Sequence, residues 1–155
     1  MKRNFGFTLL EILVAISIIV LLSSLGLASY VKFNRRQIVE QSTAKIVSEL
    51  RLAQSFAANQ QKPESGCLTL NGYFFNVDDD GVSYWISPDC SPLLVEKTKE
   101  GLVSGVIMTG FSKIEFNVLG RGVKFFDGKT QLTVSNGAGY SKTISVGEAG
   151  DIKIN

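Results

Sequence analysis

An acidic residue near the N-terminus needs a chemical explanation, because it borders a long apolar segment. Glu11 is followed by residues 12–31, which contain no charge and which as a helix would span roughly 30 Å, the thickness of a bilayer core. A charged side chain in that environment costs about 2.5–3.5 kcal/mol, so Glu11 should have a cationic partner. A cut between Gly6 and Phe7 would create one, the free amine of Phe7. On a helix this amine and Glu11 would share a face, because they are four residues apart.

This spacing resembles the processing site of type IV prepilins and pseudopilins. The resemblance rests on Gly6, Phe7 and Glu11, with Thr-Leu-Leu between the last two and the apolar run behind them. It implies that a prepilin peptidase cuts after Gly6 and methylates the new N-terminal Phe7. It also implies that Glu11 neutralises the amine of a neighbouring subunit during assembly.

Two other interpretations of the apolar segment remain open. A secretory signal could be cleaved after Ala28, because small residues stand at Gly26 and Ala28. That reading leaves Glu11 unexplained and needs a shorter apolar region. A plain single-span anchor explains the length but not the spacing of glycine, phenylalanine and glutamate.

The two cysteines, Cys67 and Cys90, lie after the apolar segment. If this part of the chain is exported, we expect them to form a disulfide. The bond would enclose about 24 residues and stabilise the fold by roughly 3 kcal/mol. Two free buried thiols are the alternative.

An acidic run partly imitates a calcium-binding loop. Residues 76–81 read Asn-Val-Asp-Asp-Asp-Gly, but the closing glutamate of an EF-hand would fall at Ser87. We therefore interpret the run as a solvated hairpin turn and expect no metal ion or other cofactor.

Basic and aromatic side chains give two further candidate surfaces. Five basic residues could form a local patch for DNA phosphates, namely Arg121, Lys124, Lys129, Lys142 and Lys153. Acidic residues are interspersed among them and favour a mixed solvated surface instead. The aromatic residues are interpreted as core and cross-strand pairs rather than a ligand platform; they are Tyr73, Phe74, Phe75, Tyr84 and Trp85.

The composition argues against common enzyme classes. The chain has no histidine, which excludes Ser-His-Asp and Cys-His catalysis. It has 16 basic and 14 acidic residues; without Lys2 and Arg3 the balance is 14 to 14, so net charge does not indicate a nucleic-acid partner. A hydrolase using carboxylates remains the rival from another class, and it needs two acidic groups that converge in a cleft.

One long helix is predicted before a β-rich head. The segment 7–31 is apolar, and 32–62 continues as an amphipathic helix with Val39, Ile46, Leu50, Ala53 and Ala57 on one face. Pro63 closes the run.

The head, 63–155, is predicted to consist of short antiparallel strands packed on that face. The expected strands are 67–70, 73–77, 82–87, 102–108, 113–118, 123–126, 131–135, 142–146 and 151–154, with turns at 71–72, 80–81, 127–128 and 147–150. The predicted fold class is therefore α+β.

The resemblance implies a membrane-anchored fibre subunit and not an enzyme. Residues 1–6 would be a cytoplasmic leader and 7–31 a span of the inner membrane, with the head exported and later carried in a pilus or pseudopilus. The expected partners are other pilin subunits, the prepilin peptidase and the inner-membrane assembly platform. The C-terminal part resembles minor pseudopilins of the H class and minor pilins of the T and U classes. A DNA-binding minor pilin is the alternative.

Overall fold

The computed structural model describes residues 6–64, 66–92 and 99–155. The predicted leader therefore lies outside the described residues except for Gly6. The chain forms two compact units, Met1–Arg36 and Gln37–Asn155, and each is described here by itself.

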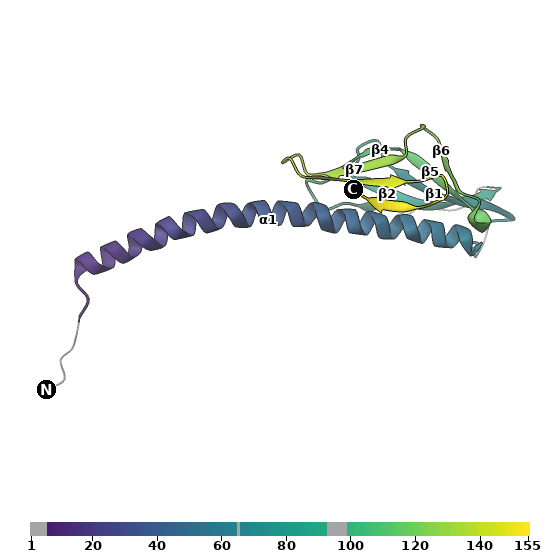
Figure 1. Ribbon diagram of the computed structural model, residues 1–155. Helices are drawn as coiled ribbons and strands as arrows, with labels where there is room; N and C mark the ends of the chain where they lie inside the picture. The colour runs from purple at the N-terminus through teal and green to yellow at the C-terminus, as the bar shows by residue number, and fades with distance from the viewer. Residues whose placement is uncertain (1–5, 65, 93–98) are drawn as a thin grey trace. The chain divides into compact units, whose positions relative to one another are not determined.

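A single helix, α1, runs from Leu9 to Ala58 and supplies residues to both units (Figure 1). The sequence predicted a helix from residue 7 to residue 62. The helix is confirmed, but it begins two residues later and ends four residues earlier than predicted. The C-terminal end is set by Gln60, whose φ of 51° is left-handed. The amide of Gln61 donates to the carbonyl of Phe56 at 3.0 Å, and the amide of Gln60 donates to that of Ala57 at 3.2 Å. This pattern ends a helix before Pro63 is reached.

The stripe predicted for the second half of the helix is buried in the second unit. Val39, Ile46, Leu50, Ala53 and Ala57 are at most 2% exposed. Four of them, all except Val39, join the hydrophobic core formed with the strands.

The strands form two antiparallel sheets (Figure 1). The first has five strands in the order β3-β2-β1-β5-β6, with bounds β3 Glu100–Gly101, β2 Ser83–Ser91, β1 Thr69–Val77, β5 Lys113–Asn117 and β6 Val123–Phe125. The second has four strands in the order β4-β7-β8-β9, with bounds β4 Ile107–Gly110, β7 Gln131–Ser135, β8 Ser141–Val146 and β9 Ile152–Ile154. A short 3-10 helix, Val118–Gly120, joins β5 and β6. The predicted α+β class is confirmed.

The head has one core, built from the helix stripe and the inner faces of both sheets. Phe75 is fully buried at its centre. Its ring stacks on Tyr84 at a centroid distance of 5.4 Å and meets Phe111 edge-on at 6.5 Å. Ile114 from the first sheet and Ile144 from the second are also fully buried.

Two local predictions were wrong. The Asn71-Gly72 pair is not a turn, because it lies inside β1, where the register with β2 shifts between Leu70 and Gly72. The region 102–108 does not form the single continuous strand that was predicted. Gly105 adopts a φ of 85°, which interrupts an extended backbone, so the region instead supplies β3 before this turn and β4 after it.

Candidate functional site

The residues before the helix form its N-terminal cap. The amide of Glu11 donates to Thr8 Oγ1 at 3.2 Å, and the amide of Ile12 donates to the Thr8 carbonyl at 3.3 Å. Thr8 and Glu11 thus stand at the first and last positions of a threonine-x-x-glutamate capping pattern. The sequence contains this capping pattern, but the interpretation of these residues as a processing site did not predict the cap.

Glu11 lies in the first turn of α1 and is exposed. In the part of the chain that the structure describes, no carboxylate–cation pair involves it. The partner predicted from the sequence, an amine at Phe7, exists only after proteolysis. Phe7 precedes the helix, with 78% of its surface exposed, and Gly6 has open space around its Cα.

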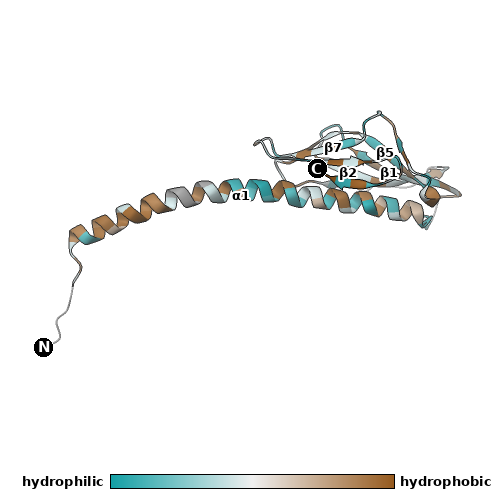
Figure 2. Ribbon diagram, in the orientation of Figure 1, coloured by the Kyte–Doolittle hydropathy of each residue, from teal (hydrophilic) through white to brown (hydrophobic). Residues whose placement is uncertain are grey.

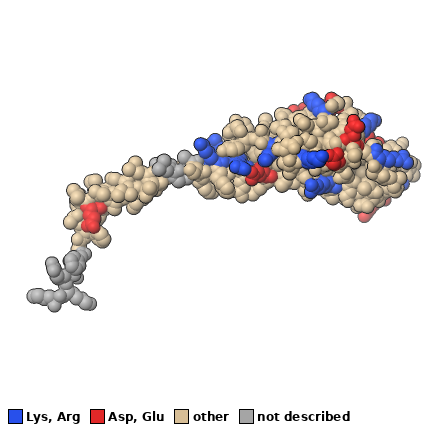
Figure 3. Space-filling model, in the orientation of Figure 1, with Lys and Arg blue, Asp and Glu red and all other residues tan. Residues whose placement is uncertain are grey.

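The apolar side chains behind Glu11 lack a covering surface within the first unit. Leu9, Leu13, Ile16 and Ile19 each expose more than half of their surface, and most apolar residues as far as Phe33 do the same. Figure 2 shows this part of α1 as predominantly hydrophobic, and Figure 3 shows acidic colour at its start with uncharged surface beyond it. Burying such a surface is favourable, so a membrane or other subunits would stabilise it.

Within the described residues, no helix meets the combined length and apolarity needed to cross a membrane.

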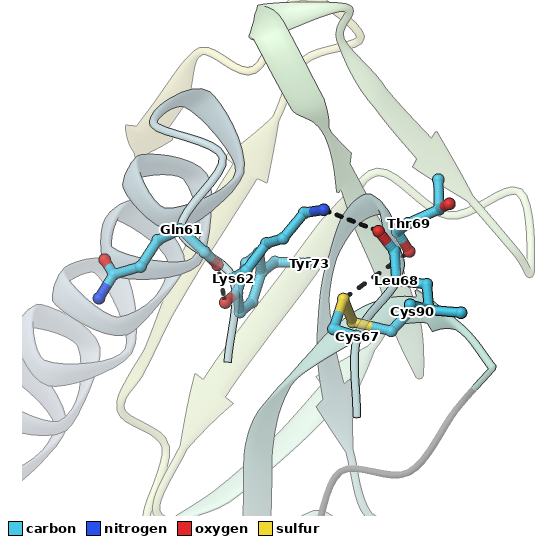
Figure 4. The surroundings of a disulfide bond; sticks show 7 residues. All are labelled: Gln61, Lys62, Cys67, Leu68, Thr69, Tyr73 and Cys90. Carbon is cyan, nitrogen blue, oxygen red and sulfur yellow. Dashed lines mark hydrogen bonds between the residues drawn. A yellow bond between two sulfur atoms is a disulfide. The ribbon is translucent and has the colours of Figure 1, made fainter. Parts of the chain in front are cut away.

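Cys67 and Cys90 are joined by an S–S bond of 2.08 Å with their Cα atoms 5.2 Å apart. The bond ties the segment before β1 to the far part of β2. Two further links hold the end of α1 nearby (Figure 4): the Tyr73 hydroxyl donates to the carbonyl of Gln61 at 2.5 Å, and Lys62 Nζ donates to the carbonyl of Leu68 at 2.7 Å. The cross-link therefore belongs to the junction of helix and sheet.

The acidic run forms the turn between β1 and β2. The Asp78 carboxylate accepts a hydrogen bond from Lys99 at 2.5 Å, and this ammonium lowers the pKa of Asp78. Asp80 Oδ1 accepts the amides of Val82 and Ser83 at 2.7 and 3.2 Å. These contacts stabilise a turn, and the described residues contain no cluster of acidic, cysteine or histidine side chains suited to a metal ion.

The five basic residues considered for DNA come from both sheets and from the connections beside β6. Lys124 lies on β6 of the first sheet, whereas Lys142 and Lys153 lie on β8 and β9 of the second. Lys153 also pairs with Asp151 at 3.0 Å. Arg121 and Lys129 lie in the connections on either side of β6.

The aromatic residues divide between two surfaces. Tyr73, Phe75 and Tyr84 are buried in the core, as predicted. Phe74 is the cross-strand partner of Ser87 on the opposite, outer face of the five-stranded sheet. Trp85 is the partner of Asn76 and lies on that outer face as well.

A buried carboxyl group on the outer face was missed by the sequence analysis. Residues 113–118 alternate polar and apolar types, a pattern typical of a strand with one solvated face, yet Glu115 is 5% exposed. Burial raises its pKa, and a hydrogen-bonding contact with the Asp89 carboxyl raises it further. Alternation identified the two faces of β5 correctly but could not show that the outer one is partly covered.

Comparison with models of protein families finds a match at the N-terminus. Residues 1–27 match the family model of the prokaryotic N-terminal methylation motif. No curated protein matches this chain. No solved structure matches it either. The matched residues contain Gly6, Phe7 and Glu11, so the match supports a type IV pilin-like chain whose N-terminus is a substrate of prepilin peptidase.

Proposed function

We propose that this chain is a structural subunit, and a minor one, of a type IV pilus or a type II secretion pseudopilus. The observation that carries the proposal is the match of residues 1–27 to the N-terminal methylation motif, with Gly6, Phe7 and Glu11 in place. The exposed apolar side chains of the first unit and the independent core of the second support it. The chain's role is packing and recognition, not catalysis.

Residues 1–6 are the cytoplasmic leader in this proposal, and residues 7–31 anchor the uncut chain in the inner membrane. Lys2 and Arg3 keep the leader in the cytoplasm, and the head is exported. The prepilin peptidase cuts after Gly6 and methylates Phe7. The assembly platform then transfers the subunit into the fibre.

Assembly depends on a charge pair that proteolysis creates. The cut leaves a positive amine at Phe7, and Glu11 of an adjoining subunit neutralises it in an environment without water. An unpaired charge at such a contact is unfavourable by several kcal/mol, so the pair selects subunits that have been cut and correctly placed. The threonine cap at Thr8 supports this role because it begins the helix at the same turn that carries Glu11.

The resemblance of the head to H-class pseudopilins and to T- and U-class minor pilins belongs to this proposal. It rests on residues 114–122 and 144–152, which form β5, β8 and the turns near them. A DNA-uptake subunit is not favoured, since the basic residues that it would use are distributed over two sheets.

The processing step is tested by intact mass and N-terminal sequencing of the chain purified from cells that contain a prepilin peptidase. We expect a chain that begins at methylated Phe7. A chain beginning at Ser29 would assign a secretory signal instead, and a chain that keeps residues 1–6 would refute the proposal.

The assembly step is tested by Glu11→Gln, with Glu148→Gln as a control acid in the head. We expect the Glu11 variant to be cut normally but to be recovered from sheared fibres far less than the unaltered chain. Equal recovery of both variants would refute the charge pair while leaving the processing result intact.

A further inference from the structure

The outer face of the five-stranded sheet carries acidic and basic side chains in register. Phe74, Glu115 and Lys124 are consecutive cross-strand partners on β1, β5 and β6. Asn76 and Lys113 form the neighbouring pair on β1 and β5. Adjacent strands lie about 4.8 Å apart, so Glu115 is within easy reach of Lys124.

The two lysines nevertheless contact aromatic rings instead of the acid. Lys113 Nζ lies 3.6 Å from the ring centroid of Phe74 and 4.7 Å from that of Phe126. Lys124 Nζ lies 4.9 Å from the centroid of the same Phe126 ring. Among the described residues, neither ammonium forms an ion pair with a carboxylate.

Glu115 turns away from both lysines because a glycine leaves room for it. A Cβ atom at Gly72 would lie 2.9 Å from Glu115 Oε1 and 3.1 Å from Cγ, so the side chain extends over this glycine. Gly72 is in turn the cross-strand partner of Asp89, whose carboxyl contacts that of Glu115. Acid therefore meets acid on one side of the face, and two ammonium groups share one ring on the other.

This segregation leaves two ammonium groups that form no ion pair among the described residues beside the Phe126 ring, which is 46% exposed. The carboxyl group of Glu115 attracts both electrostatically but does not contact them. Cation–aromatic contacts hold the lysines in place, but they do not neutralise them. We propose that Lys113, Lys124 and Phe126 form a binding site for the carboxylates of an acidic polypeptide segment. The site goes beyond the proposed function and does not depend on it.

A polypeptide fits this face better than a nucleic acid. Two ammonium groups match one or two carboxylates, whereas a polyphosphate needs a longer positive surface. The exposed ring of Phe126 offers an apolar contact to a peptide.

The site is tested by titrating the full chain, isotopically labelled and held in an uncharged detergent, with an end-blocked hexaglutamate peptide. Backbone amide shifts report where the peptide binds, and their salt dependence reports the electrostatic contribution. The decisive variant is Lys113→Gln with Lys124→Gln. Its matched control is Lys142→Gln with Lys153→Gln, which removes the same charge from the other sheet.

We expect shifts centred on residues 74, 113, 124 and 126, and a dissociation constant raised about tenfold or more in the decisive variant. The control variant should bind within about twofold of the unaltered chain. Glu115→Gln should retain binding, because this acid does not pair with the lysines.

Three results would overturn the proposal: shifts elsewhere on the head, equal binding by the decisive variant and the control, or equal binding of a hexaglutamine peptide. A hexathymidylate that binds at these residues more tightly than hexaglutamate would assign the site to nucleic acid and would overturn it as well.

Discussion

Replacing Glu115 by glutamine should stabilise the head at neutral pH. The side chain is 5% exposed and its carboxyl group contacts another acid, Asp89, so ionisation places two negative charges side by side away from bulk water. A buried polar group left without a partner costs about 1–3 kcal/mol. Glutamine keeps the shape, removes the charge and can donate to Asp89. We expect Glu115→Gln to raise the free energy of unfolding by about 1–2 kcal/mol near pH 7.5.

The pH dependence of the free energy of unfolding follows from the direction in which the pKa of Glu115 is shifted. Burial raises the pKa of Glu115 in the folded state, so the folded chain holds a proton that the unfolded chain has released. The contribution of this group to stability is complete below the unfolded pKa of about 4.3 and is lost as the pH rises through the folded pKa. The glutamine variant should therefore gain over the unaltered chain as the pH rises, and the gain should vanish near pH 4.

Trp85 makes the measurement direct. It is the single tryptophan and lies on β2 of the same sheet, so its fluorescence during urea unfolding reports the head. The midpoint should shift while the dependence on urea stays constant. The exposed Glu148→Gln serves as the control and should change the free energy by less than about 0.5 kcal/mol. If Glu115→Gln has the same pH profile as the unaltered chain, the raised pKa of the buried Glu115 carboxyl group is wrong.

Three other substitutions have clear expectations, each measured by the same urea titration. Gln60→Gly should stabilise the chain by about 0.5–1 kcal/mol, since glycine adopts the left-handed φ of 51° without strain; destabilisation would contradict the helix end described here. Removing the bond between Cys67 and Cys90 with a double serine variant should cost about 3 kcal/mol, and a chain unaffected by reducing agent would show that the bond does not form. Gly72→Ala should cost more than about 2 kcal/mol, because its Cβ would lie 2.5 Å from the carbonyl oxygen of Phe116; a neutral result would mean that β1 and β5 can separate at this point.

The fold could be predicted from periodicity because the helix stripe and the strands obey simple spacing rules. Ile46, Leu50 and Ala53 recur at helical intervals and are all fully buried, and the segment 131–135 was placed with the bounds of β7. Backbone conformation caused the errors. Asn71-Gly72 has the composition of a tight turn, but Gly72 is needed inside β1 to leave space for Glu115, and composition alone does not separate the two uses.

The candidate processing residues could be found in the sequence because the motif that contains them is defined by spacing along the chain. Gly6, Phe7 and Glu11 stand at the fixed spacing that such a linear motif records. The outer-face site could not be read in this way. It depends on Lys113 of β5 and Lys124 of β6, which both contact the ring of Phe126. It also depends on Glu115, which contacts Asp89 of β2 instead of the lysines. Such an arrangement arises only from strand order and register.

The cross-link between Cys67, just before β1, and Cys90 of β2 has a mechanical consequence. A chain held in a fibre and pulled from its head would unravel by peeling strands from the sheet, and the 23-residue separation between Cys67 and Cys90 would normally add to its length. While the disulfide is intact, the residues between the two cysteines do not extend under force. The fully stretched disulfide-bonded chain is therefore about 75 Å shorter than the fully stretched reduced chain. A subunit exposed to shear would thus yield less before it breaks, and stretching single molecules with and without reductant would measure the difference.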